Sequence, residues 1–201
     1  GKVGNFQSED FRLAFGEQSF FEGAISFNGL PDFSQTFIKL QCDRSRLHIQ
    51  DFRTFFPDFR PPLNLEKLGL TRFQGNFTGF PSDFVAYGNF QTALGTVRTD
   101  LNLKQPSQPK AASYSGKLSL QEFDIGTLLE AESELGNITM SGSVEGQGLR
   151  LKHLRTNLQA AVPRLNYHGY TYNKIRVEGA ITDENFRGTL TADDPALGLD
   201  F

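Results

Sequence analysis

Side chains that could carry out catalysis are few and scattered in this sequence. The three histidines are His48, His153 and His168, and the single cysteine is Cys42. None of them stands in a zinc-protease motif, a nucleophile elbow or a phosphate-binding glycine loop. The sequence permits a Cys–His nucleophile pair, but Cys42 lies among apolar residues near the end of a predicted strand. We therefore interpret Cys42 as a half-buried structural thiol.

The acidic residues form no recognisable catalytic or metal-binding group either. Asp183-Glu184 and Asp193-Asp194 are neighbours in predicted turns, whereas the two carboxylates of a glycosidase face each other across a cleft. We interpret both pairs as solvated turn residues. A single cysteine supports neither an intrachain disulfide nor a zinc site built on several thiolates. The sequence therefore predicts a protein that is not an enzyme, with no cofactor and no metal site.

Composition and charge argue against two classes of partner. The 201 residues include 20 Lys and Arg against 23 Asp and Glu, a formal charge of −3. A nucleic-acid-binding protein normally carries a basic excess, and so does a polybasic membrane-binding surface. Apolar residues make up 38% of the chain and 20 residues are Phe, which indicates a folded protein. We predict no membrane-spanning helix, because no apolar run approaches about 18 residues.

Apolar and polar residues alternate along most of the chain, with the period of two that marks strands with one buried face. Turn residues such as Asn28-Gly29 and His168-Gly169 separate the alternating segments. The pattern predicts an all-β fold, a long curled antiparallel sheet. The clearest alternating segments are 11–15, 73–79, 97–103, 138–144, 154–162, 175–181 and 186–192.

Two short segments have a helical pattern, and they resemble each other. Residues 51–56 and 124–131 both begin with Asp, which is a favourable N-cap, and both then place apolar residues three and four positions apart. Each follows a predicted strand, so we interpret the two as an internal repeat of a strand and a helical turn. We predict short helical turns near residues 51–56 and 124–131.

Glycine recurs on the apolar side of the predicted strands. The motif reads apolar, any residue, Gly, any residue, apolar, and its instances are 21–25, 73–77, 114–118, 140–144, 177–181 and 186–190. Gly weakens a strand, so its repeated use has a geometric reason. Either the sheet bends where the side chain is missing, or something else fills the gap, such as a facing side chain or a ligand.

We interpret residues 1–201 as one elongated β-sheet unit and as a fragment of a longer protein. Residues 1–4 lack the character of a leader segment, and residues 196–201 alternate like a strand and then stop. The segment 104–113 is polar and contains proline, so we predict a flexible loop there.

Several segments together resemble the Phe- and Gly-rich TamB-type proteins of Bacteroidota, translocation and assembly module proteins of the AsmA-like superfamily. These segments are 75–80, 84–95, 100–103, 114–118, 123–129, 165–175 and 186–188. The resemblance implies an internal periplasmic segment with a β-taco fold, a curled sheet with an apolar concave interior. It implies that the intact protein is anchored in the inner membrane of a Gram-negative bacterium. It also implies phospholipid transport to the outer membrane, a role in outer-membrane β-barrel assembly, and no catalytic residues.

The alternation and the resemblance both indicate an apolar sheet face that no long helix can cover. We expect this face to form a hydrophobic groove that shields phospholipid acyl chains between the two membranes, because burying a 16-carbon chain is worth about 12 kcal/mol. The candidate groove residues, chosen by strand parity, are Phe77, Phe90, Leu94, Val97, Leu101, Leu118, Leu120, Met140, Val144, Leu158, Val177, Ile181 and Leu190.

Two other functions are compatible with the sequence. In the first, the sheet closes over a dry core and its edge strands pair with a partner, for example a protein of outer-membrane β-barrel assembly. In the second, the chain binds or degrades a polysaccharide. The second function is weaker, because the chain has no Trp and no cluster of carboxylates.

Overall fold

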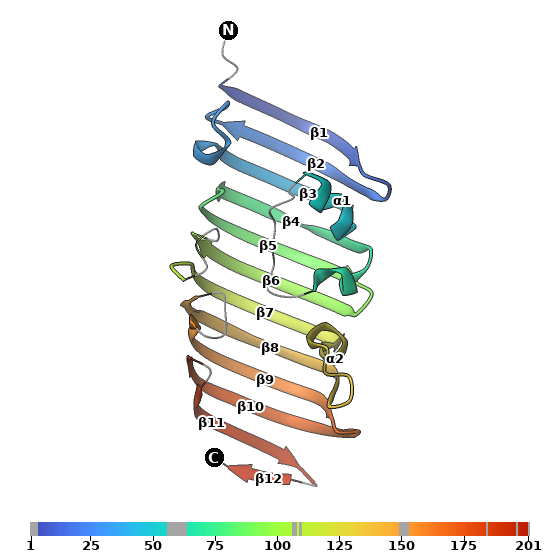
Figure 1. Cartoon of the computed structure of the whole chain (residues 1–201), viewed down its shortest axis with the longest axis vertical. Coiled ribbons are helices and arrows are strands. Elements are labelled where there is room, and N and C mark those ends of the chain that lie inside the picture. Colours follow the sequence, from blue (N-terminus) through green and yellow to red (C-terminus); the bar gives the residue numbers. More distant parts are fainter. Residues whose placement is uncertain are drawn as a thin grey trace.

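The chain forms one antiparallel sheet of twelve strands that follow each other in sequence order (Figure 1). The computed structural model describes residues 4–55, 64–105, 108, 110–148, 153–183, 185–195 and 197–200. Strands β1 and β12 lie at the two ends of the sheet, so the described sheet is open and not closed into a barrel. This confirms the predicted all-β class and the antiparallel pairing of sequence neighbours.

The strands are long and similar in length, as their alternating sequences predict. They are β1 (Asn5–Phe15), β2 (Ser19–Asn28), β3 (Phe37–Leu47), β4 (Thr71–Phe80), β5 (Asp83–Thr92), β6 (Gly95–Lys104), β7 (Ser113–Asp124), β8 (Leu135–Gln147), β9 (Arg155–Tyr167), β10 (Tyr170–Thr182), β11 (Asn185–Asp194) and β12 (Leu197–Asp200). The predicted loop 104–113 therefore begins and ends within strand residues. Positions 106, 107 and 109 lie outside the described residues, and the flexibility of the loop stays a prediction.

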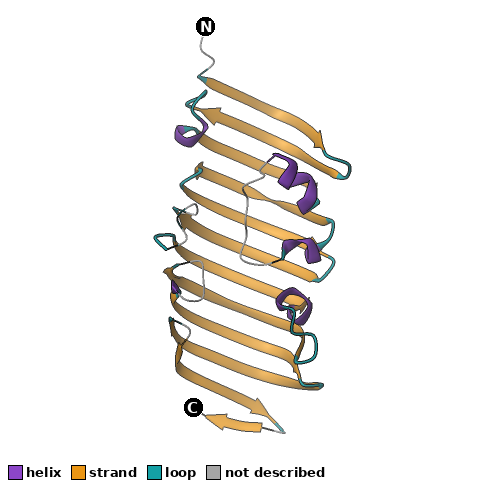
Figure 2. Cartoon of the chain, in the orientation of Figure 1, coloured by secondary structure: helices purple, strands orange, loops and turns teal. Residues whose placement is uncertain are grey.

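Four short helical elements accompany the sheet: η1 (Phe33–Gln35), α1 (Ile49–Phe55), η2 (Leu65–Leu68) and α2 (Ile125–Leu129). Figure 2 shows α1, η2 and α2 in front of the sheet along its right-hand margin. Both predicted helical turns are present: α1 begins two residues before position 51, and residue 56 lies outside the described residues. α2 ends at Leu129 because Glu130 takes a left-handed backbone conformation, with φ of 59°.

The two Asp residues of the repeat have different roles. Asp124 is the N-cap of α2, and its carboxylate accepts hydrogen bonds from the Thr127 amide at 2.8 Å and the Thr127 hydroxyl at 2.6 Å. Asp51 lies inside α1 and does not cap it, contrary to the expectation from its pattern. Its carboxylate instead accepts hydrogen bonds from the backbone amides of Glu17 and Gln18, both at 3.1 Å. Asp51 thus fastens α1 to the β1–β2 turn.

Strand register places the alternating apolar side chains on one face of the sheet. Phe73 pairs with Phe90, and the same row continues through Val97 and Leu120 to Met140. We call this side the apolar face. Its main residues are Phe11, Leu13, Phe21, Ile25, Phe27, Ile38, Leu40, Cys42, Phe73, Phe77, Phe84, Ala86, Phe90, Val97, Leu101, Leu103, Leu118, Leu120, Met140, Val144, Leu158, Ala160, Val162, Ile175, Val177, Ile181, Phe186, Leu190 and Ala192.

The residues between them point to the opposite side, the polar face, whose central members include Asn76, Asp100, Lys117, Ser143 and Glu178. Antiparallel sheets commonly have one apolar face that packs against other atoms and one polar face in contact with water, and this sheet is divided in that way.

The best-buried packing lies on the apolar face towards the margin with α2. Phe123, at the end of β7, is 2% exposed and is among the largest fully buried side chains. Val162, Ile175 and Ala192 form a buried cluster across β9, β10 and β11. The central part of the face is half-buried instead, since the short helices cover only one margin. No helix in the described ranges is long and apolar enough to cross a membrane.

The glycines of the apolar face admit the backbone of the neighbouring strand. A Cβ atom on Gly75 would lie 2.1 Å from the Tyr87 carbonyl oxygen, and one on Gly116 would lie 2.0 Å from the Asp100 carbonyl oxygen. Gly88 is filled differently, because a Cβ there would lie 2.5 Å from the ring of Phe90. A side chain that fills the gap, one of the explanations considered from the sequence, therefore applies at Gly88, whereas Gly75 and Gly116 make room for the backbone of the neighbouring strand.

Candidate functional site

The candidate groove residues share the apolar face, with one exception. Phe77, Phe90, Val97, Leu101, Leu118, Leu120, Met140, Val144, Leu158, Val177, Ile181 and Leu190 all lie in strands on that side. Leu94 is the exception, because it lies in the two-residue turn between β5 and β6, where strand parity does not apply. Leu120 is buried, at 8% exposure, and the others are half-buried. The candidates therefore form a continuous strip across β4 to β11.

Aromatic rings extend the strip towards the N-terminal strands. The Phe21 and Phe73 rings are 5.6 Å apart, and the Phe73 and Phe90 rings are 5.8 Å apart. The Phe77 and Phe84 rings are 4.6 Å apart. The candidate set omits the residues of β2 and β3 on this face, although the alternation of residues 21–27 was sufficient to find those of β2.

The apolar face stays uncovered at both ends of the sheet. Phe6 and Leu13 on β1 are 41% and 45% exposed, and Phe186 on β11 is 46% exposed. Register aligns Phe6 with Phe27, and Phe186 with Ile181, so all three exposed residues belong to the same face. The described strip thus runs from one end of the sheet to the other without a closing element.

One buried polar atom within the described strip has no hydrogen-bond partner. Thr99 lies opposite Gly88 on β5 and Leu118 on β7. Its hydroxyl oxygen is buried and has no hydrogen-bond partner in the described part of the chain. The alternation of β6 places Thr99 on the apolar face, but only the structure shows that its hydroxyl is left unpaired.

The described residues with catalytic potential lie in different elements of the fold. Cys42 is buried in the interior of β3, between Gly23 and Gly75 of the adjacent strands, and this burial raises the pKa of its thiol. His48 precedes α1, and His168 lies in the β9–β10 turn. Among the described residues, no three His, Cys, Asp or Glu side chains are grouped to hold a metal ion. The interpretation of Cys42 as a structural thiol agrees with this placement.

Asp194 contradicts the interpretation of the acidic pairs as solvated. It is 6% exposed, and its carboxylate accepts hydrogen bonds from the Tyr170 hydroxyl at 2.7 Å and from the Asn173 amide at 2.9 Å. The interaction with Asp194 raises the pKa of Tyr170. Asp194 therefore fastens the start of β10 to the end of β11, and Asp183 remains in an exposed turn.

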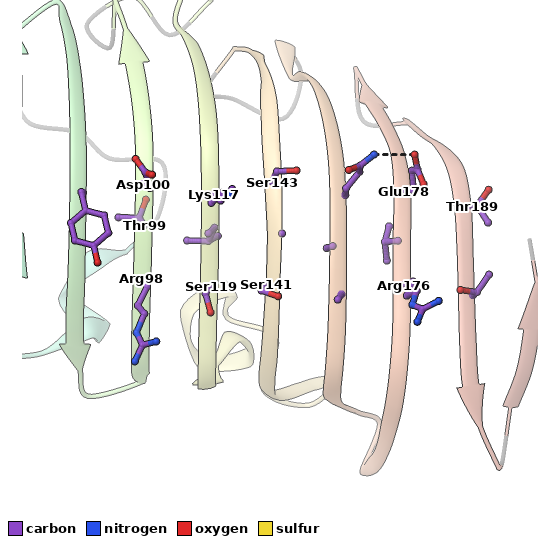
Figure 3. Close-up of a pocket in the computed structure, with 18 residues that line it drawn as sticks. Arg98, Thr99, Asp100, Lys117, Ser119, Ser141, Ser143, Arg176, Glu178 and Thr189 are labelled. Atoms are coloured by element: carbon purple, nitrogen blue, oxygen red, sulfur yellow. Dashed lines mark hydrogen bonds between the residues drawn. The ribbon is translucent and has the colours of Figure 1, made fainter.

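A hollow of about 920 Å³ lies on the polar face, opposite the strip. Figure 3 views this side: Ser119, Ser141 and Ser143 are in its floor, with Arg98 and Arg176 on flanking strands. Both signs of charge line it, since Asp100, Lys117 and Glu178 also border the hollow. Serine hydroxyls and charged side chains border the hollow, although apolar atoms make up most of its lining surface.

The apolar face is thus the candidate functional site of the described sheet. Its chemistry is the shielding of apolar material from water. Comparison of the chain with protein-family models, with curated proteins and with solved structures gave no match.

Proposed function

We propose that this sheet is a lipid-conducting segment that shields phospholipid acyl chains on its apolar face. The observation that carries the proposal is the continuous strip of half-buried apolar residues, uncovered at both ends of the sheet. In this proposal the segment acts in the periplasm, as part of a protein anchored in the inner membrane. It supports outer-membrane biogenesis by carrying lipid between the two membranes. The resemblance to TamB-type proteins supports the setting.

The dimensions of the strip suit this role. Twelve strands at a spacing of about 4.8 Å span roughly 50 Å. The hydrocarbon core of a bilayer is about 30 Å thick, so an acyl chain in one leaflet extends over about 15 Å. The strip can therefore shield about three acyl chains placed end to end. Successive rows have similar apolar residues, so a chain can move along them without a deep energy minimum.

Contact between acyl chains and the apolar face is favoured over exposure of both to water. Each CH₂ group removed from water is worth about 0.8 kcal/mol, and an exposed apolar face of this length promotes aggregation. The charged groups of the described chain do not converge on the strip, so the proposed cargo is recognised by its tails. This predicts little preference among phospholipids that differ only in the headgroup.

The test compares two adjacent residues of β8 that lie on opposite faces. Val144 is half-buried in the strip between Gly116 and Leu158, whereas Ser143 is exposed on the polar face opposite Lys117. Val144→Asp and Ser143→Asp add the same charge to the same strand. Each protein is purified from bacteria with minimal detergent, and bound lipid is measured by native mass spectrometry and by lipid extraction.

We expect phospholipid to accompany the wild type and Ser143→Asp, and Val144→Asp to lose it while retaining the circular dichroism of a β-sheet. Lipid-free wild-type protein, or equal lipid in both variants, contradicts the proposal. If Val144→Asp does not fold, Leu158→Asn repeats the comparison on the neighbouring strand with a smaller perturbation.

An interaction module is the second candidate function, because β1 and β12 each pair on one side only. A partner strand, for example from an outer-membrane β-barrel assembly protein, can add to such an edge. β1 has features that discourage pairing: its register shifts between Ser8 and Phe11, and Glu9 and Asp10 lie in the shifted region. Photo-crosslinking from β12 distinguishes this function, since crosslinks to a polypeptide in place of lipid favour it.

A further inference from the structure

A second hollow, of about 340 Å³, lies on the polar face over β2 to β5, and we call it the arginine hollow. Arg44, Arg46 and Arg72 line it, together with Phe20 and the amide side chains of Gln74, Asn89 and Gln91. No acidic residue belongs to this lining. Phe73 and Ser45, which belong to the apolar face, also border the hollow. The arginine and amide side chains lie on the opposite side of the sheet, so a ligand held by them binds independently of the lipid-shielding strip.

Positive charges oppose each other directly in the arginine hollow. Arg46 on β3 is the register partner of Arg72 on β4. Like charges placed opposite each other on neighbouring strands are destabilising. Arg44 has an ion pair with Glu22 at 2.8 Å, but none of the ion pairs of the described chain involves Arg46 or Arg72. Two guanidinium groups therefore remain without a counter-ion from the described protein.

An aromatic ring holds the guanidinium groups in place. The Arg46 guanidinium lies 5.0 Å from the centre of the Phe20 ring, and that of Arg12 lies 5.4 Å from the same ring. Stacking on an aromatic ring restricts the guanidinium plane and leaves its N–H donors free. The Arg46 guanidinium is therefore partly ordered before any ligand is bound.

We propose that the arginine hollow binds a phosphate group carried by a small polyol. Guanidinium groups pair with phosphate oxygens through parallel hydrogen bonds, and an anion between Arg46 and Arg72 removes their repulsion. The amides of Gln74, Asn89 and Gln91 supply hydrogen bonds for hydroxyl groups. The volume exceeds that needed for a bare phosphate ion. Glycerol phosphate has this chemistry, whether free or as the headgroup of a phospholipid.

The stability of Arg72→Gln distinguishes an arginine that binds a ligand from one that only supports the fold. Arg72 has no cation–π contact or ion pair in the described structure, so its replacement removes repulsion and costs no contact of this kind. We expect the urea midpoint of Arg72→Gln to equal or exceed that of the wild type, while ligand affinity falls at least tenfold. A clear loss of stability instead indicates that the arginine serves the fold.

The binding experiment measures the affinity of the whole chain for glycerol 3-phosphate by calorimetry or by NMR titration. Arg187→Gln is the matched control, because it removes the same charge from the polar face at β11, far along the sheet. We expect Arg72→Gln to weaken binding and Arg187→Gln to leave it unchanged. Binding should also weaken as salt concentration rises. No saturable binding at millimolar ligand, or equal losses in the two variants, overturns the proposal.

Vesicles distinguish the two sources of the phosphate. Binding to vesicles of phosphatidylglycerol and not of phosphatidylcholine, with loss in Arg72→Gln, assigns the site to a lipid headgroup. Binding of glycerol 3-phosphate without such vesicle binding assigns it to a soluble phosphate ester. Neither outcome depends on Val144, so this site and the lipid-shielding strip can fail independently.

Discussion

Replacing Gly75 by alanine tests why glycine recurs on the apolar face. A Cβ atom there would lie 2.1 Å from the Tyr87 carbonyl oxygen and 2.8 Å from Cα of Gly88, closer than the 3.0 Å below which real Cβ atoms essentially never approach. Gly75 does not have a positive φ, so the substitution adds bulk without forcing an unfavourable backbone conformation. Strands β4 and β5 must therefore separate locally by roughly 1 Å.

The expected cost follows from this displacement. A shift of roughly 1 Å breaks about two of the hydrogen bonds between the strands, each worth about 0.5–1.5 kcal/mol, and residual angle strain adds about 1 kcal/mol. Alanine offsets about 0.4–1 kcal/mol of this cost, because it restricts the conformations of the unfolded chain. We expect Gly75→Ala to lower the free energy of unfolding by about 2 kcal/mol.

Urea denaturation followed by circular dichroism measures the change. With a slope of about 2–3 kcal/mol per molar urea, the midpoint should fall by roughly 0.7–1 M. Gly136→Ala is the control, since the atoms nearest its Cβ would belong to the Asn166 side chain, the closest at 3.1 Å. The overlap is smaller and involves no backbone atom among these, so this change should cost clearly less than Gly75→Ala. If Gly75→Ala is as stable as the wild type, close backbone approach does not explain the glycines.

Three further predictions concern the supports of the sheet. The hydrogen bond from Ser19, and then those from Glu17 and Gln18, lower the pKa of Asp51 below 3.8. The ionised Asp51 carboxylate therefore stabilises the fold above that pH, and this stabilisation is lost as the pH falls through the lower pKa of the folded state. Asp51→Asn should therefore be less stable than the wild type at pH 7 in urea denaturation, and a difference that persists unchanged into strong acid contradicts this. Phe123→Ala should cost about 3–5 kcal/mol in the same assay because it empties a fully buried site, and a cost under about 1 kcal/mol argues against tight packing beneath α2. Cys42 should react with a maleimide far more slowly in the native protein than in urea, because burial raises its pKa, and equal rates show that β3 opens readily.

The faces of the sheet were predictable because each strand pairs with its sequence neighbour. Within each strand the apolar residues mark one face, and pairing of neighbouring strands aligns these faces, so residues as distant as Phe77 and Leu190 lie on one side. Leu94 escaped this reasoning because it lies in a turn, where alternation carries no information. Strand parity therefore predicts a sheet face well and a turn residue poorly.

Contacts between distant residues were not predictable. Asp51 resembles an N-cap in its local sequence, and only the fold brings it to the amide of Glu17, 34 positions earlier. The pairing of Arg46 with Arg72 depends on a long connection between β3 and β4, whose length does not determine register. The arginine hollow was therefore invisible in a sequence whose net charge is −3.

The strictly sequential strand order also governs how the sheet gains and loses its structure. Each strand needs only its predecessor as a template, so the sheet can extend one hairpin at a time while the chain is still being synthesised. Force applied at the two ends should open the same contacts in reverse, one strand after another, in a series of small steps. A sheet that pairs strands far apart in the sequence would instead resist the applied force and then unfold in a single step. Optical-tweezers traces of the chain should therefore show a ladder of short extensions, beginning from the terminal strands.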